Sequence, residues 1–180
     1  CATDRGLSRF NGESWRTWTA ADGLPCDEVR AVCASKDGRV WLSSQEKLCC
    51  FDGITFTIHP LPEGNKAKFM YNIAIDGEGA IWTDAWEEMS LEGTWTATGI
   101  WRFRNGAWDL ATIPEELRCA TLYIRGVVSD GGKSVWFSSY HGLLEWNGMT
   151  FVRHRTDTPD TFWSGDIAVD RNNTVWFANM

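Results

Sequence analysis

The chain has 180 residues, of which 43% are apolar and 23% charged, and this composition is that of a globular protein of one or two domains. A formal net charge of −7 argues against nucleic acid and anionic membrane as partners, because both are bound by clustered Lys and Arg. No apolar run is long enough to span a bilayer, so we expect no membrane contact by this segment.

A hairpin pattern opens the chain and then recurs. Each copy has an Asn-Gly or Asp-Gly turn between alternating apolar residues, followed by an aromatic residue, and this is the strongest short-range hairpin signal. The copies are GLSRFNGESWRTW (6–18), KLCCFDGITFTIH (47–59), GIWRFRNGAWDLA (99–111) and GLLEWNGMTFVRH (142–154).

A second pattern, centred on a tryptophan, alternates with these hairpins. It reads SKDGRVWL, DGEGAIWT, DGGKSVWF and DRNNTVWF, and it places Trp41, Trp82, Trp136 and Trp176 at separations of 41, 54 and 40 residues. Each copy follows a short apolar strand, and its turn contains the Asp, Gly and Asn residues that tight hairpins favour. The residue six positions before the tryptophan is Ser35, Asp76, Asp130 or Asp170. Each unit therefore has four short antiparallel strands.

Four strands in a unit of roughly 40 to 50 residues are typical of a propeller blade. We therefore predict an all-β fold, a single β-propeller domain over residues 1–180 that is built from four four-stranded blades. The chain starts with the third and fourth strands of a unit and stops after the first and second, so we expect the N- and C-terminal strands to complete one blade. The pattern also allows a larger ring or a dimeric ring. A β-helical solenoid fits less well, because its coils are shorter and lack paired Asn-Gly hairpins.

Residues 6–44, GLSRFNGESWRTWTAADGLPCDEVRAVCASKDGRVWLSS, resemble the two-component regulator propeller repeat almost throughout. The later units depart from this repeat, because PLPEGNKAK, PEELRCA and TDTPDTFWS stand in place of its DGLP segment. Propellers of this family form the periplasmic sensor of hybrid histidine kinases and often respond to oligosaccharides. The resemblance implies a ligand-binding sensor module of a two-component signalling protein, in the periplasm or outside the cell. A weaker likeness to streptogramin lyase points to an enzyme instead.

One loop between a second and a third strand is much longer than its counterparts. It reads TDAWEEMSLEGTWTATG, residues 83–99, and we expect it on the face of the propeller where binding loops gather. Tryptophans beside carboxylates suit a sugar, through ring stacking and hydrogen bonds to hydroxyl groups. The alternative is a loop that folds over its own blade and buries its first tryptophan. The predicted ligand-binding residues are Asp84, Trp86, Glu87, Trp95, Tyr140, His141 and Trp163.

The favoured function is recognition of a small-molecule or oligosaccharide ligand, with a second copy of the chain or neighbouring propeller units as further partners. A propeller lyase or glycan hydrolase and a platform for protein–protein interaction are the alternatives. We expect no catalytic residues, because the sequence contains no nucleophile, metalloprotease or phosphate-binding motif. We expect neither a cofactor nor a metal, since the six cysteines form no C-x-x-C pair and no histidine has zinc-ligand spacing.

Overall fold

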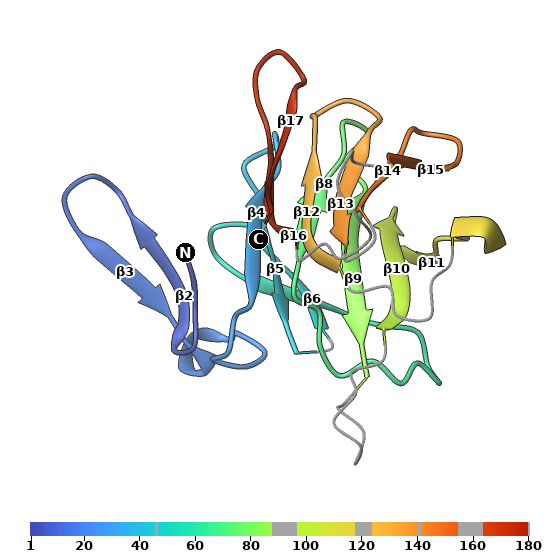
Figure 1. Ribbon diagram of the computed structural model, residues 1–180. Coiled ribbons are helices and arrows are strands. Elements are labelled where there is room, and N and C mark those ends of the chain that lie inside the picture. The colour runs from blue at the N-terminus through green and yellow to red at the C-terminus, as the bar shows by residue number, and fades with distance from the viewer. Residues whose placement is uncertain (46, 88–96, 118–123, 140–141, 155–163, 180) are drawn as a thin grey trace. The chain divides into compact units, whose positions relative to one another are not determined.

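A computed structural model describes residues 1–45, 47–87, 97–117, 124–139, 142–154 and 164–179 of the chain. Within these residues, antiparallel strands are joined by turns and by two short 3-10 helices, η1 (Ala20–Asp22) and η2 (Glu115–Leu117) (Figure 1). The all-β prediction is confirmed. Neither of these helices is long and apolar enough to cross a membrane.

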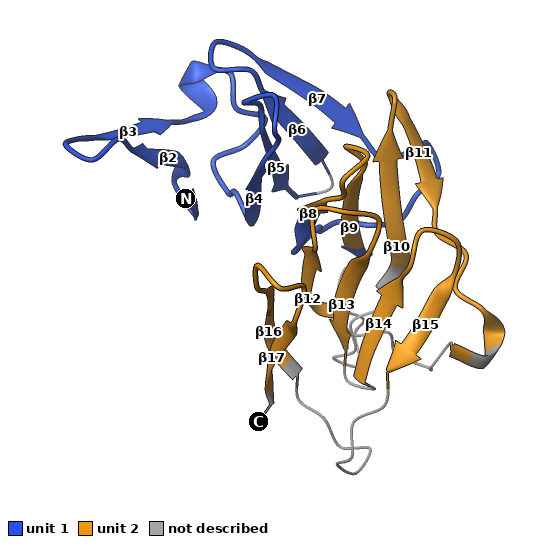
Figure 2. Cartoon of the chain, turned by 90° about the horizontal axis from the view of Figure 1, so that it is seen from above, with its two compact units in different colours: residues 1–73, 85–98 blue, residues 74–84, 99–180 orange. Residues whose placement is uncertain are grey.

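The chain divides into two compact units, which Figure 2 shows in different colours. Unit 1 comprises Cys1–Ile73 and Ala85–Thr98, and unit 2 comprises Ala74–Asp84 and Gly99–Met180. The boundary passes through strands β8 (Ile73–Ile75), β9 (Ile81–Trp86) and β10 (Ala97–Arg104), so each of these strands contributes residues to both units.

Unit 1 contains a three-stranded and a four-stranded sheet. The strands of the first, in spatial order, are β1 (Ala2–Thr3), β2 (Gly6–Phe10) and β3 (Trp15–Trp18). Those of the second are β4 (Ala31–Ala34), β5 (Val40–Ser44), β6 (Lys47–Phe51) and β7 (Phe56–Pro60). Both sheets contribute to one core, whose buried members are Leu7, Trp18, Leu24, Val29, Leu42, Cys49 and Phe51.

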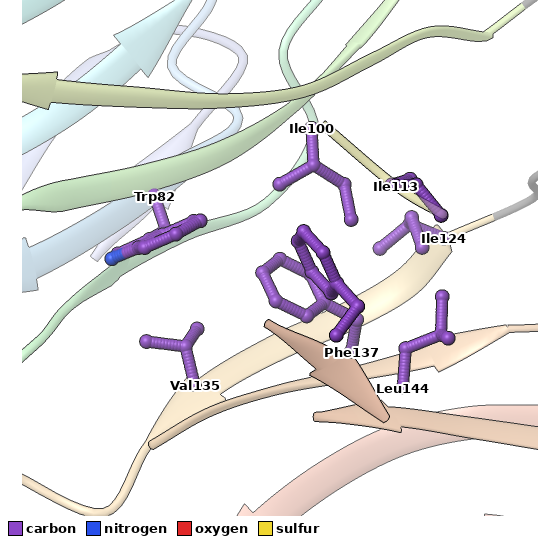
Figure 3. Packing of buried hydrophobic residues seen from close by; sticks show 8 residues of the cluster. Trp82, Ile100, Ile113, Ile124, Val135, Phe137 and Leu144 are labelled. Atoms are coloured by element: carbon purple, nitrogen blue, oxygen red, sulfur yellow. The ribbon is translucent and has the colours of Figure 1, made fainter. Parts of the chain in front are cut away.

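Unit 2 contains most of one four-stranded sheet, a second four-stranded sheet and a two-stranded sheet. The first is formed by β8 (Ile73–Ile75), β9, β10 and β11 (Ala107–Leu110). The second has β12 (Ile124–Ser129), β13 (Val135–Ser139), β14 (Gly142–Trp146) and β15 (Phe151–His154), and the third has β16 (Ser164–Val169) and β17 (Val175–Asn179). Side chains of the two larger sheets meet in a core around Phe137 (Figure 3).

The predicted hairpins form because their turn residues satisfy the backbone locally. The side-chain oxygen of Asn11 accepts two backbone N–H bonds within its turn, and Asp52 and Asn147 do the same, at 2.8–3.0 Å. Asn105 and Gly106 both have positive φ, 52° and 81°, as a two-residue turn requires. Each turn thereby sets an aromatic residue opposite another across the hairpin.

The same set of hydrogen bonds occurs in two of the repeats and explains why an aspartate lies six residues before the tryptophan. One carboxylate oxygen of Asp76 accepts the N–H groups of Glu78 and Ala80, and the other accepts the indole N–H of Trp82 at 2.8 Å. Asp170 binds its own turn and the Trp176 indole, at 3.0 Å, in the same way. These donors, Trp176 first, hold the pKa of Asp170 below its usual range. The aspartate therefore fixes both the turn and the direction of the indole ring.

The first and last described strands belong to two small sheets. The β1–β2–β3 sheet of unit 1 has the pairs Ala2↔Leu7 and Thr3↔Gly6 between β1 and β2, and the β16–β17 sheet lies in unit 2. The sequence prediction took the first strand to begin at Gly6 and overlooked the two-residue strand β1.

Candidate functional site

The sequence-predicted ligand site centres on the end of strand β9, and the structure describes part of it. Asp84 and Trp86 lie in β9 and not in the following loop, and their exposed fractions are 1% and 4%. Glu87 comes directly after the strand and is half-buried. Four further predicted residues, Trp95, Tyr140, His141 and Trp163, lie outside the described residues. In the structure the loop therefore begins after Trp86, later than the sequence analysis predicted.

Trp86 is held by the segment that leads out of the preceding sheet. Its carbonyl oxygen accepts the N–H groups of Lys68 and Phe69 at 2.6 and 3.1 Å, and its own N–H donates to the Phe69 oxygen at 2.9 Å. Because the side chain is buried as well, Trp86 stabilises the fold in this region. The alternative raised from the sequence, a buried Trp86, matches this burial.

Asp84 lies two residues after Trp82, and the equivalent position in two other sequence repeats holds a serine. These residues are Ser43 in β5 and Ser138 in β13, and all three side chains are buried. The Ser43 hydroxyl accepts the Ala31 N–H at 3.1 Å, and the Ser138 hydroxyl donates to the Gly165 carbonyl at 3.0 Å. At this position the serines bind the backbone of a neighbouring strand, and Asp84 places a carboxylate there.

A hollow of about 340 Å³ lies within unit 2. The buried Trp82 is one of its lining residues, and the half-buried Trp146 packs against Trp82 with ring centroids 5.4 Å apart. Arg102 donates to Asp109 at 3.2 Å and places its guanidinium 5.5 Å from the Trp82 ring centroid. The remaining lining residues are Leu110, Ala111, Thr112, Met149 and Thr150. The hollow thus combines an indole, apolar side chains, hydroxyl groups and an ion pair.

The β10–β11 hairpin positions the charged pair of this hollow. Its two-residue turn sets the register that places Arg102 opposite Asp109, with Phe103 opposite Trp108. Phe103 is buried, so it fixes the hairpin while Arg102 lies on the other face of the strand. The sequence analysis treated these strands as structural and missed the pair, although counting outward from Asn105-Gly106 yields this register.

A larger hollow of about 570 Å³ lies within unit 1 and has a different chemistry. Phe10, Trp18, Val32 and Phe51 are among the residues that line it, together with Cys33. Burial raises the pKa of the Cys33 thiol to about 12, so this group is uncharged and a poor nucleophile at neutral pH. The hollow is therefore an apolar recess without an activated group among its described residues.

The electrostatics of the described ranges offer no metal centre, because no three His, Cys, Asp or Glu side chains there gather closely enough to hold an ion. The one described histidine with a displaced pKa is His59, which stacks on Trp41 with ring centroids 5.6 Å apart. Burial and the charge of Arg39 lower its pKa.

Comparison with family models matches residues 23–46 to the two component regulator propeller. These 24 residues match one repeat of this kind. The likeness noted from the sequence is thus confirmed. No curated protein sequence matches the chain significantly.

Solved structures identify the fold as a β-propeller, as the sequence predicted. Two extracellular domains from B. thetaiotaomicron, described as belonging to a one component and a hybrid two component system, superpose with TM-scores of 0.72 and 0.71 at 15% and 14% identity. An ancestral GH74 enzyme superposes with a TM-score of 0.70 at 18% identity. Each match covers 99% of this chain but about a quarter of the other one, 24%, 24% and 25%. At these identities the likeness establishes the fold alone.

The matched propeller repeat begins where the chain turns from the first sheet into the second. Thr19 and Asp22 cap η1 reciprocally, and Gly23 ends it with φ 93°. Leu24 and Val29 follow and are buried in the core of unit 1. The Val29 N–H donates to the Thr3 oxygen at 2.9 Å, which ties the repeat to β1. The start of the matched repeat therefore connects the β1–β3 sheet to the β4–β7 sheet.

Proposed function

We propose that this chain is a ligand-binding sensor module of a two-component signalling protein, and that it recognises a carbohydrate-like ligand in the periplasm or outside the cell. The propeller repeat at residues 23–46 and the extracellular two-component domains with the same fold support the sensor assignment. The observation that carries the ligand assignment is the hollow of unit 2, which the half-buried Trp146 and the paired Arg102 and Asp109 line.

The chemistry of this hollow suits a sugar ring. A sugar has apolar C–H faces that stack on an indole, and hydroxyl groups that exchange hydrogen bonds with charged and hydroxyl side chains. Trp146, Leu110 and Met149 would contact the apolar face. Arg102 would donate to ring hydroxyls, and Asp109 would accept from them. Trp82 is too deeply buried to touch the ligand and would support Trp146 from below.

The seven residues predicted from the sequence define a competing ligand site. Glu87 is half-buried at its described edge, whereas Asp84 and Trp86 are buried. We propose that Trp95, Tyr140, His141 and Trp163 contribute to binding if the ligand occupies the loop face. The experiment below separates the two locations.

The test is calorimetric titration of the 180-residue chain with a panel of oligosaccharides. For a sugar that binds, we expect Arg102→Gln and Asp109→Asn each to weaken binding by about tenfold, because each removes a charged hydrogen bond worth roughly 1.5–3 kcal/mol. Arg104→Gln is the matched control, since Arg104 lies two residues further along β10 and pairs with Glu78 outside the hollow.

Three results would contradict parts of this proposal. Unchanged affinity in the Arg102 and Asp109 variants, with a loss in Trp95→Ala, would move the ligand to the loop face. Absence of binding across the panel would reject a carbohydrate ligand. Release of cleaved sugar during the titration would favour the hydrolase or lyase alternative.

A further inference from the structure

Two residues that line the unit 2 hollow place a hydrogen-bond donor and an acceptor side by side. The Nη2 atom of Arg102 donates to Oδ2 of Asp109 at 3.2 Å, and the two side chains are 30% and 59% exposed. Among the described residues, this is the only hydrogen bond or ion pair of either side chain. A guanidinium has several N–H groups and a carboxylate accepts with both oxygens, so the pair keeps donors and acceptors for a ligand.

The structure fixes the spacing of this pair before a ligand arrives. The guanidinium carbon of Arg102 lies 5.5 Å from the ring centroid of Trp82, which is buried and donates its indole N–H to Asp76 at 2.8 Å. Asp109 is placed by the register of the β10–β11 hairpin, which sets it directly opposite Arg102. Because the donor and the acceptor already lie together, binding to both costs less conformational entropy.

The charges of the pair cancel, and this limits the class of ligand. A carboxylate or sulfate on the ligand would compete with Asp109 for Arg102 next to a like charge, and an ammonium group would meet the guanidinium in the same way. The neighbouring cation of β10, Arg104, is also paired, with Glu78 at 2.7 Å. The formal net charge of −7 further disfavours an anion. The hollow therefore favours an uncharged group that offers an acceptor and a donor close together.

We propose, on the basis of the sugar-binding function above, that the hollow recognises a neutral sugar through two adjacent unsubstituted hydroxyl groups. One hydroxyl oxygen would accept an N–H of Arg102, while the neighbouring hydroxyl donates to Asp109. Adjacent hydroxyl oxygens on a sugar ring are about as far apart as the two atoms of the pair, so both bonds form together. The C–H face of the ring would lie on Trp146. Uronic acids, sulfated sugars and sugars substituted at either hydroxyl would bind more weakly.

The experiment measures binding of simple glycosides to the 180-residue chain by NMR titration. The probes are the methyl glycosides of glucose, galactose and mannose, with analogues in which each hydroxyl in turn is replaced by hydrogen. For a glycoside that binds, loss of either of two adjacent hydroxyls should weaken binding by roughly tenfold, and loss of any other hydroxyl should have a smaller effect. The uronic acid of the same configuration should bind more weakly than the neutral glycoside.

Two variants assign these hydroxyls to their partners. In Asp109→Ala, loss of the donating hydroxyl should no longer weaken binding, and in Arg102→Met the same should hold for the accepting hydroxyl, because the partner is already absent. Arg104→Met is the matched control, since it removes a positive charge from the same strand but outside the hollow, and it should leave both losses unchanged. A substitution that merely disturbed the fold would weaken binding of every analogue alike.

The proposal is overturned if the sensitive hydroxyls are not adjacent, if the variants leave their losses unchanged, or if the uronic acid binds more tightly than the neutral sugar. Sugar binding is still observed in each of these cases, so the proposed function stands. Loss of binding in Trp95→Ala, with no effect of the Arg102 and Asp109 variants, also overturns this assignment alone. Absence of binding by all three glycosides overturns the proposal, and absence across the oligosaccharide panel as well rejects the function itself.

Discussion

At the scale of single residues, the aspartate that precedes the repeat tryptophan by six positions accepts several N–H groups with a single carboxylate. Asp76 satisfies two turn N–H groups and the indole N–H of Trp82 with one carboxylate. Trp82 is fully covered, so no water can replace this acceptor. In Trp176 the same bond lies at the surface, where water can replace it.

We therefore expect Asp76→Ala to lower the free energy of unfolding by about 1–3 kcal/mol, because it leaves a buried N–H without an acceptor. Asp170→Ala should cause a smaller loss. Urea unfolding followed by circular dichroism measures both variants against the wild type. Equal losses would show that the turn, and not the buried indole, carries the effect.

A second residue-scale prediction concerns His59, which lies against Trp41 and near Arg39. Burial and the Arg39 charge lower its pKa in the folded chain, so the unfolded chain binds this proton more tightly. The free energy of unfolding should therefore fall as the pH decreases from about 6.5, the unfolded value, to the lower folded value.

The variant His59→Phe keeps an aromatic ring against Trp41 and cannot be protonated. Its free energy of unfolding should depend less on pH in this window than that of the wild type. Chemical unfolding at pH 7 and pH 5 measures the difference. Identical pH dependence in the two proteins would exclude the proposed effect of His59.

At the scale of elements, the hairpins were predictable because their turn chemistry is local. Asn11, Asp52 and Asn147 each satisfy their own turn, and the aromatic register follows directly. Strand β1, which pairs with β2, was not predicted because a strand of two residues has no periodicity.

The candidate site was less predictable for a related physical reason. A run of polar and aromatic residues after a strand reads as a loop, yet the first of them, Asp84 and Trp86, continue β9. The pairing of Trp86 with Phe69 comes from a segment that has no strand signal of its own. The pairing of Arg102 with Asp109, in contrast, could be counted from the turn.

At the scale of the whole molecule, the division into two units does not coincide with the sheets. Strand β9 has Ile81–Asp84 in unit 2 and Ala85–Trp86 in unit 1, and β10 is divided similarly. Each unit has a core of its own, around Leu42 in unit 1 and around Leu144 in unit 2. If unit 1 unfolds, the unit 1 ends of three shared strands, β8, β9 and β10, unfold with it, so the two cores are expected to unfold together.

Two core truncations test this coupling. Leu42→Ala and Leu144→Ala each remove a fully buried side chain, and each should cost about 2–5 kcal/mol. Because the shared strands join the cores, both variants should show one thermal transition, shifted to lower temperature, in far-ultraviolet circular dichroism and in tryptophan fluorescence alike. Ile54→Ser, on the surface, should leave the midpoint unchanged. Two separate transitions, of which each truncation shifts only one, would instead show that the units unfold independently and that the strands joining them transmit no cooperativity.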